Sequence, residues 1–232
     1  MSTSKDRRLP LAVQDLAARL GAGRNAAENR VELRQKGRMR QTQTGSWMAF
    51  RARQSISTVH CQFDWLARAG PFGVISAHDC LRPTDGGLDV YALGIFPLMR
   101  AAHTPQLLRG QRMRYLAELA LAPDAIVGNL ELRWREEGSD RLVVSVGDGQ
   151  TMAEVALTLD SQGRIASAFA PDRPRSVTPP FQLTPWRGRF SDYRNHNGKW
   201  LPFGAEVSWQ IDGKEFVYWQ GTILTSLVVS ER

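Results

Sequence analysis

The chain has 232 residues and the composition of a folded globular protein, since 42% of its residues are hydrophobic and 23% are charged. Intrinsic disorder would require fewer apolar residues. The net charge is +7, and the basic residues are mostly arginine, with only four lysines among 30. A basic balance favours anionic partners, but these arginines are spread along the chain and form no block. We therefore expect a well-solvated basic surface, with nucleic acid as a disfavoured partner.

The N-terminal residues, the lengths of the apolar runs and the cysteines predict the cellular location of the protein. Residues 1–10 are polar and basic with no apolar stretch behind them, so no secretion signal is expected. No run approaches the roughly 18 apolar residues of a membrane span. Two cysteines, Cys61 and Cys80, are too few for a disulfide framework. These features predict a cytoplasmic protein without a transmembrane segment, and they leave peripheral membrane contact open.

A short amphipathic helix is expected near the N-terminus, over residues 9–20. Val13, Leu16 and Leu20 follow the helical repeat, and Gly21 supplies a stop. From Asn29 the pattern changes to strands rich in β-branched and aromatic residues and separated by turns. The expected strands cover residues 31–40, 47–57, 60–68, 72–81, 88–96, 130–135, 141–146, 151–159 and 164–170.

The middle of the chain contains a second predicted helix, over residues 105–121. Leu108, Met113, Leu116 and Leu119 lie roughly on one of its faces, and Pro123 ends it. The proline-rich segment 172–185 is expected to be an irregular connection to the last strands.

The C-terminal segment, residues 186–230, predicts a three-stranded meander with a defined register. Asn197-Gly198 and Asp212-Gly213 are strong signals for two-residue hairpin turns. These turns place Phe190 opposite Ala205, Val207 opposite Tyr218, and Trp209 opposite Phe216. On the other face they place Arg189, Glu206 and Trp219 in one row.

These elements together predict an α+β fold built on one curved antiparallel β-sheet, a half-barrel of about 10–12 strands. The helix at 105–121 is expected to cover the concave face. We expect an N-terminal helix and lead-in over residues 1–28, followed by a single half-barrel domain over 29–232.

The charged motif of the central helix is the first candidate site. Arg114 and Glu118 are spaced to form an i, i+4 ion pair, with Tyr115 beside them. If this face turns toward the sheet, the charges need partners. The motif then either anchors the polar end of a ligand, supplies an acid–base group, or fixes the helix on the sheet as a structural ion pair.

The C-terminal aromatic and charged residues form the second candidate site. Aromatic residues on strands usually pack in the core, but they can also line an apolar ligand site. The row of Arg189 and Glu206 is either a solvent-facing ladder or an anion site inside the concavity. The candidate ligand-binding residues of this region are Trp186, Arg189, Tyr193, Glu206, Trp209, Phe216 and Trp219.

A metal site was the weakest candidate. A two-residue turn at Gly70-Pro71 would place Cys61 opposite Cys80 and bring His78 to the same face, as the start of a zinc site. No fourth ligand is evident, so we expect neither metal nor cofactor. The chain also lacks a glycine-rich phosphate loop, a nucleophile elbow and a metalloprotease helix motif, which disfavours an enzyme.

Several of these motifs resemble a bacterial domain-of-unknown-function family over nearly the whole chain. The resemblance implies no particular activity, and Leu121 stands where that family carries an aromatic residue. The matching positions are residues 35–40, Arg114 to Glu118 with Pro123, residues 184–193, Gly198, Pro202, residues 206–209, Tyr218 and Trp219.

The final third of the chain is also similar to lipoprotein-sorting carriers of the LolA/LolB type. The likeness rests on Asp192-Tyr193, Asn197-Gly198 and Leu201-Pro202. It implies a curved antiparallel half-barrel plugged by helices and enclosing an apolar cavity.

The leading hypothesis is a non-enzymatic protein that binds an apolar or amphipathic, lipid-like molecule between sheet and helix. Arg114, Tyr115 and Glu118 would hold its polar end, and the C-terminal aromatics would form the wall. Two alternatives stay open. One is an enzyme with Glu118 as general acid or base, and the other is an arginine-driven binder of nucleic acid or anionic membrane.

Overall fold

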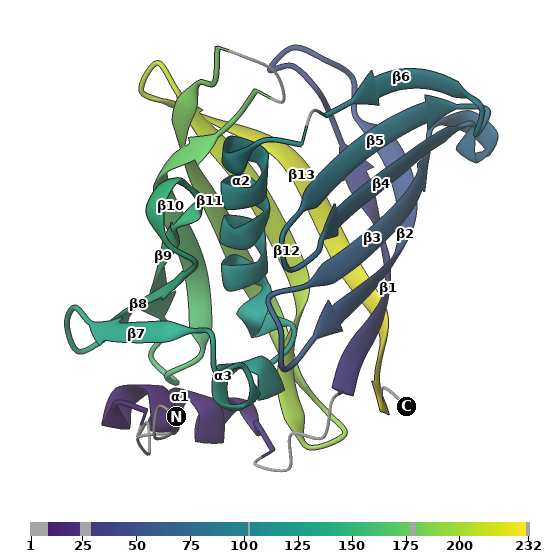
Figure 1. Ribbon diagram of the computed structural model, residues 1–232. Helices are drawn as coiled ribbons and strands as arrows, with labels where there is room; N and C mark the ends of the chain where they lie inside the picture. Colours follow the sequence, from purple (N-terminus) through teal and green to yellow (C-terminus); the bar gives the residue numbers. More distant parts are fainter. Residues whose placement is uncertain (1–8, 24–28, 102, 177–179, 231–232) are drawn as a thin grey trace.

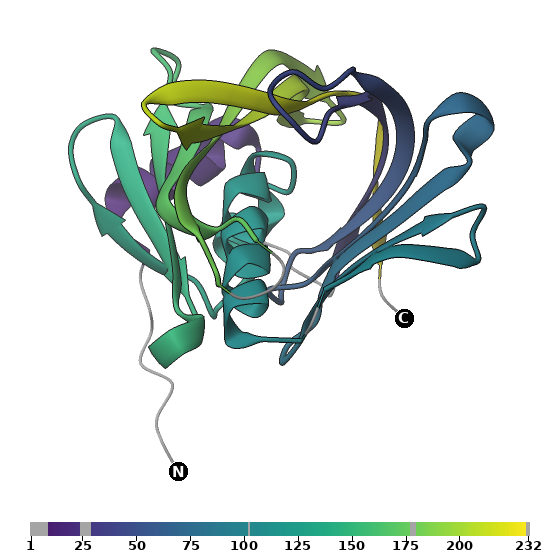
Figure 2. The same ribbon diagram turned by 90° about the horizontal axis from the view of Figure 1, so that it is seen from above.

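The computed structural model describes residues 9–23, 29–101, 103–176 and 180–230. Over these ranges the strands form one antiparallel sheet of 13 strands, in the order β6-β5-β4-β3-β2-β1-β13-β12-β11-β10-β9-β8-β7. The sheet curls into a half-barrel around α2 (Figures 1 and 2). The predicted α+β half-barrel with a helix on its concave face is therefore confirmed, with one strand more than the upper estimate.

The strands are β1 (Asn29–Met39), β2 (Met48–Ser57), β3 (Phe63–Ala69), β4 (Ile75–Leu81), β5 (Gly86–Ala92), β6 (Phe96–Arg100), β7 (Arg133–Glu136), β8 (Arg141–Val146), β9 (Ala153–Leu159), β10 (Ile165–Pro174), β11 (Leu183–His196), β12 (Lys199–Ile211) and β13 (Lys214–Ser230). The helices are α1 (Leu11–Leu20), α2 (Pro105–Ala117) and α3 (Asp124–Gly128), with 3₁₀ turns η1 (Pro71–Gly73), η2 (Glu118–Ala120) and η3 (Gly149–Thr151).

The C-terminal meander lies at the centre of the sheet, because β13 pairs with β1 and so joins the two halves of the chain. The β11–β12 register is the predicted one, with Phe190 opposite Ala205. Between β12 and β13, Trp209 lies opposite Phe216, also as predicted. The hairpin turns therefore determined most of the pairing at the middle of the half-barrel.

The predicted β12–β13 register is wrong beyond Ser208. A β-bulge between Val207 and Ser208 places Val207 opposite Trp219, and Glu206 opposite Gln220. The outer row is therefore Arg189, Glu206 and Gln220, without Trp219. The bulge accommodates Tyr218, whose ring stacks on Trp209 at 5.8 Å, and a two-residue turn cannot encode that extra residue.

The first half of the sheet departs from prediction at its turns. Residues 71–73 form η1 instead of a two-residue turn, so Phe63 lies opposite Leu81 and Asp64 opposite Cys80. The predicted strand over 88–96 is two strands, β5 and β6, because the chain reverses at Leu93-Gly94. The connection expected over 172–185 is also shorter, since β10 runs to Pro174 and β11 begins at Leu183.

Helix α2 lies inside the curve of the sheet. It begins after Thr104, whose hydroxyl accepts a hydrogen bond from the Leu107 N–H, with Pro105 at the first helical position. The helix packs most closely on β9 and β10, touches β8 beside them, and contacts β4 and β5 of the other arm. Figure 2 shows α2 nearer to the β7–β10 arm, with β12, β13 and β1 curving behind it.

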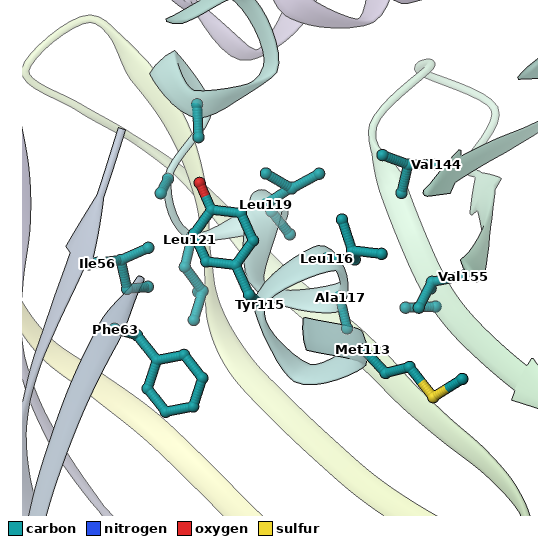
Figure 3. Packing of buried hydrophobic residues seen from close by; sticks show 14 of the residues in the cluster. Ile56, Phe63, Met113, Tyr115, Leu116, Ala117, Leu119, Leu121, Val144 and Val155 are labelled. Atoms are coloured by element: carbon teal, nitrogen blue, oxygen red, sulfur yellow. The ribbon is translucent and has the colours of Figure 1, made fainter. Parts of the chain in front are cut away.

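The lower half of the molecule is a solid apolar core. Tyr115, Leu116 and Leu119 are at most 1% exposed. Figure 3 shows them between Ile56 and Phe63 of one arm and residues of β8 and β9 of the other. Helix α1 buries Val13, Leu16 and Leu20 and packs beside α3 and β12, where it closes this end of the half-barrel. The predicted lead-in at residues 24–28 lies outside the described residues.

Candidate functional site

One face of α2 carries charge into the half-barrel. The Arg114 Nε donates to Glu118 Oε1 at 2.8 Å, one helical turn away, and the Arg114 Nη1 donates to Asp79 of β4. The Gln111 amide of the same helix face also donates to Asp79. The predicted i, i+4 pair therefore forms, and it extends to a carboxylate on the sheet that was not among the predicted site residues.

The polar chain continues across the sheet through two glutamines. Gln54 of β2 donates to Glu118 Oε2 at 2.6 Å, Gln35 of β1 donates to Gln54 at 2.8 Å, and Trp65 of β3 donates to Gln35 at 3.0 Å. Seven side chains are thus linked by hydrogen bonds, with Trp65 at one end and Gln111 at the other, and we call them the polar chain. Its members are Trp65, Gln35, Gln54, Glu118, Arg114, Asp79 and Gln111.

The polar chain has one cation and two carboxylates. Burial opposes the charge on Arg114, but Glu118 and Asp79 outweigh that effect and raise the pKa of its guanidinium. The same guanidinium lies 4.6 Å from the Phe63 ring and 5.3 Å from the Trp65 ring, within cation–π range. Arg114 therefore has its charge fully compensated by the protein itself, as a structural ion pair requires.

Two features keep this region open to a further partner. The side chains of Arg114, Asp79 and Glu118 retain 12–16% of their exposure, so they are not sealed. Among the residues that the structure describes, the buried Oε1 of Gln111 finds no hydrogen-bond partner, although the amide nitrogen of the same side chain donates to Asp79. A buried acceptor without a donor costs free energy, and a hydroxyl, ammonium or water that reached it would recover that cost.

Tyr115 lies in the apolar core, between Ile56 and Leu116 (Figure 3). Its hydroxyl donates to the Ser57 carbonyl and accepts from the Asn129 amide, both at 3.0 Å. Burial raises the pKa of Tyr115, so the phenol stays neutral. Of the three predicted helix residues, Arg114 and Glu118 thus lie together in the polar chain, and Tyr115 belongs to the packed core.

The concave face above the polar chain carries a row of apolar residues across the central strands. Met48, Met39, Trp219 and Val207 are successive cross-strand neighbours from β2 to β12. All four side chains are only partly buried. Directly below, Gly37 and Gly221 face each other, and the Trp219 ring lies over Gly221 and 5.5 Å from the Phe50 ring. Because neither glycine has a side chain, there is room here for the rings of Trp219 and Phe50.

The predicted wall residues Trp186, Trp209 and Phe216 gather at the upper end of β11–β13. Trp186 Nε1 donates to the Tyr218 hydroxyl at 3.1 Å, and Tyr218 stacks on Trp209. The Arg173 guanidinium lies 4.5 Å from the Trp186 ring and also donates to the Gly110 carbonyl of α2. This contact joins the aromatic cluster to the helix.

Arg189 and Glu206 lie on the opposite, convex face. Arg189 donates to both carboxylate oxygens of Glu215 at 2.5 and 3.0 Å and to Glu206 at 3.4 Å. Its side chain is 42% exposed, so this row is the solvent-facing ladder. Tyr193 is also apart from the helix, since its hydroxyl donates to the Ile165 carbonyl and Arg164 covers its ring.

This ladder makes a prediction about pH. Arg189 is the main cause that lowers the pKa of Glu215 from its ordinary value of 4.5, and Ser208 also donates to that carboxylate. A lowered folded-state pKa stabilises the protein above the unfolded pKa, and the contribution disappears as pH falls below 4.5. An Arg189→Gln variant should thus be about 0.5–1 kcal/mol less stable at neutral pH. Urea unfolding should show the difference shrinking below pH 4.5, and an equal deficit at every pH would contradict it.

The proposed zinc site does not form. Cys61 precedes β3 and is buried, and Cys80 lies opposite Asp64 and Gly87. His78 instead contacts Asp64 at 3.0 Å. No group of three potential metal-ligating side chains occurs within the described ranges. The error follows from η1, which shifts the β3–β4 register.

Five members of the polar chain were not among the predicted site residues: Trp65 and Gln111, and the three polar strand residues Gln35, Gln54 and Asp79. The three polar strand residues share one feature. Each occupies an inward position on its strand, where apolar residues alternate with outward polar ones, as in Val31-x-Leu33-x-Gln35. A polar residue at an inward position was the available signal. This signal alone does not show that the three side chains meet, because that depends on the registers of β1 to β4, and the turn at Gly70-Pro71 predicts a different β3–β4 register.

The chain belongs to the family of unknown function DUF6544, whose model matches residues 1–221. No curated protein matches the chain.

Three solved structures are similar in fold. The first is a putative outer membrane lipoprotein-sorting protein domain from Vibrio parahaemolyticus, with 14% identity, a TM-score of 0.51, and coverage of 94% of this chain and 90% of that one. The second is a DUF1329 family protein from Desulfovibrio piger, with 11% identity, a TM-score of 0.50, and coverage of 93% and 91% of the two chains. The third is a LolA superfamily protein from Nitrosomonas europaea, with 12% identity, a TM-score of 0.49, and coverage of 94% and 93%. At these identities the likeness to the Vibrio parahaemolyticus and Desulfovibrio piger proteins shows the fold alone. Within the described residues, no helix is long and apolar enough to cross a membrane.

Proposed function

We propose that this protein binds an apolar or amphipathic, lipid-like molecule on the concave face of its half-barrel. The observation that carries the proposal is the row of Met48, Met39, Trp219 and Val207, which stays partly exposed on the inner side of a curved sheet. Exposed apolar surface on an inward-curving wall is the feature that apolar ligand sites share. The fold, which it has in common with a lipoprotein-sorting protein domain, supports the same class of ligand.

The polar chain would meet the polar end of this ligand. Arg114 is already compensated by Asp79 and Glu118, so it offers little to an additional anion. Within the described part of the polar chain, the acceptor without a donor is Gln111 Oε1. The polar chain as a whole carries a net negative charge, because Arg114 faces the two carboxylates of Asp79 and Glu118. A ligand end that donates hydrogen bonds, such as a hydroxyl or an ammonium group, therefore suits this site better than a carboxylate or phosphate.

An enzyme is not the function proposed. Glu118 accepts hydrogen bonds from both Arg114 and Gln54, which occupies each of its carboxylate oxygens. A general acid or base exchanges its proton with substrate, whereas both oxygens of this carboxylate are engaged in holding Arg114 and Gln54. This arrangement supports a structural role for the ion pair.

The test is uptake of a fluorescent long-chain alcohol by the full chain. Val207→Asp places a charge at the β12 end of the apolar row and should weaken binding at least about 30-fold, because a carboxylate cannot be buried against an acyl chain. Thr222→Asp adds the same charge on the exposed outer face of β13 and should bind like the wild type. Equal binding by both variants would contradict the proposal.

A further inference from the structure

The outer face of β1, β2 and β3 carries a basic row. Lys36, Arg51 and Arg68 are direct cross-strand neighbours, and Arg34 lies opposite Arg53 one step along the same strands. All five side chains are exposed. The row is therefore a compact cationic surface in a protein whose arginines are otherwise dispersed.

This arrangement is unfavourable for the isolated protein. Like charges directly opposite each other on neighbouring strands destabilise a sheet. Among the residues that the structure describes, none of these five forms a salt bridge, although other arginines on the sheet, such as Arg189 and Arg194, do. Folding alone gives no reason to keep three cations in one line, and an anionic partner does.

Two apolar loops project beside the basic row. Phe72 of η1 and Leu93 of the β5–β6 turn are 105% and 65% exposed, and Ile95 is 71% exposed. The two loops are joined by a hydrogen bond from the Leu93 N–H to the Val74 carbonyl at 2.6 Å, and they lie at the same end of the arm (Figure 1). Phe72, Lys36, Arg51 and Arg68 line one shallow groove of about 930 Å³.

The backbone of both loops is strained at the exposed apolar residue. Phe72 has φ 56° and Leu93 has φ 52°, in the left-handed region that bulky residues rarely adopt. Glycine or asparagine would fit both positions better. Two exposed apolar side chains on two strained, adjacent turns indicate a surface selected for contact and not for stability.

We propose that this surface docks on an anionic lipid bilayer, with the basic row against the headgroups and the Phe72 and Leu93 loops entering the interface. Cations beside exposed apolar side chains match the two layers of such a surface, which is charged outside and apolar beneath. Nucleic acid fits less well, because Phe72 is the one aromatic ring among these three exposed side chains, and Leu93 and Ile95 give no further surface on which a base can stack. The surface is on the outer face and is separate from the concave site.

The test of the charge component is flotation of the full chain with phosphatidylcholine vesicles, with and without phosphatidylglycerol. The wild type should bind only the anionic vesicles. Lys36→Gln, Arg51→Gln and Arg68→Gln together should lower the partition coefficient roughly 100-fold. A matched triple variant, Arg133→Gln, Arg187→Gln and Lys214→Gln, has the same net charge and should bind like the wild type. Equal losses in the two triple variants would overturn the assignment of the surface.

The test of the apolar component uses Phe72→Asn and Leu93→Asn in one variant. Vesicle binding should fall roughly 10-fold or more, since two apolar side chains leave the interface. The melting temperature should rise, because asparagine tolerates positive φ. A variant that floats like the wild type, or a wild type that binds single-stranded DNA and no vesicles, would overturn the proposal.

Discussion

Replacing Arg114 with methionine is expected to lower the free energy of unfolding by about 3–5 kcal/mol. The methionine retains the apolar volume against Phe63 and Trp65, but it leaves Asp79 and Glu118 buried without their cation. Breaking a buried ion pair from one side is costly for this reason. Urea unfolding at neutral pH measures the loss.

The control for this prediction removes all three charges together. Arg114→Met combined with Asp79→Asn and Glu118→Gln leaves no uncompensated charge, and the amides can still accept from Gln111 and Gln54. This triple variant should recover most of the stability lost in the single variant. If the triple variant were less stable than Arg114→Met, the polar chain would owe its stability to something other than charge compensation.

Replacing Gly37 with alanine is expected to cost about 3 kcal/mol. A Cβ at this position would overlap the backbone carbonyl of Gln220 on β13 and lie 2.8 Å from the Phe50 ring. The carbonyl belongs to the β1–β13 pairing that closes the sheet, so it cannot move without breaking that register. Thermal and urea unfolding should both show the loss.

Gly221 provides the matched comparison, because it lies directly opposite Gly37. A Cβ at Gly221 would meet only the far edge of the Trp219 indole, which can rotate away. Gly221→Ala should therefore cost about 1 kcal/mol or less in stability. It should still weaken uptake of the fluorescent alcohol, since the Trp219 indole would be pushed out of its place in the apolar row. Equal destabilisation by the two substitutions would contradict this account of the glycine pair.

The architecture could be predicted from sequence largely because of short turns and strict alternation. Asn197-Gly198 fixed the β11–β12 register at every pair, and burial alternates residue by residue along β3. The predicted registers are wrong where a strand or a turn contains an extra residue. The bulge that accommodates Tyr218 and the 3₁₀ turn at residues 71–73 each change a register, and neither has a turn motif that specifies it.

The candidate site was predicted in part, and the reason is again register. The Arg114–Glu118 pair depends only on helical spacing, so it could be identified within one element. Asp79, Gln54 and Gln35 join that pair from three strands of the other arm, and their meeting depends on how the whole sheet curls. Local sequence patterns carry no information about that long-range contact.

The central claim is that the concave face holds an apolar or amphipathic molecule. Native mass spectrometry of the purified full chain, followed by solvent extraction, tests it most directly. We expect a stoichiometric adduct that extracts as a lipid-like molecule with a hydroxyl or amine at its polar end, and its loss in the Val207→Asp variant. A clean mass without adduct, together with no uptake of fluorescent alcohol or fatty acid, would contradict the claim.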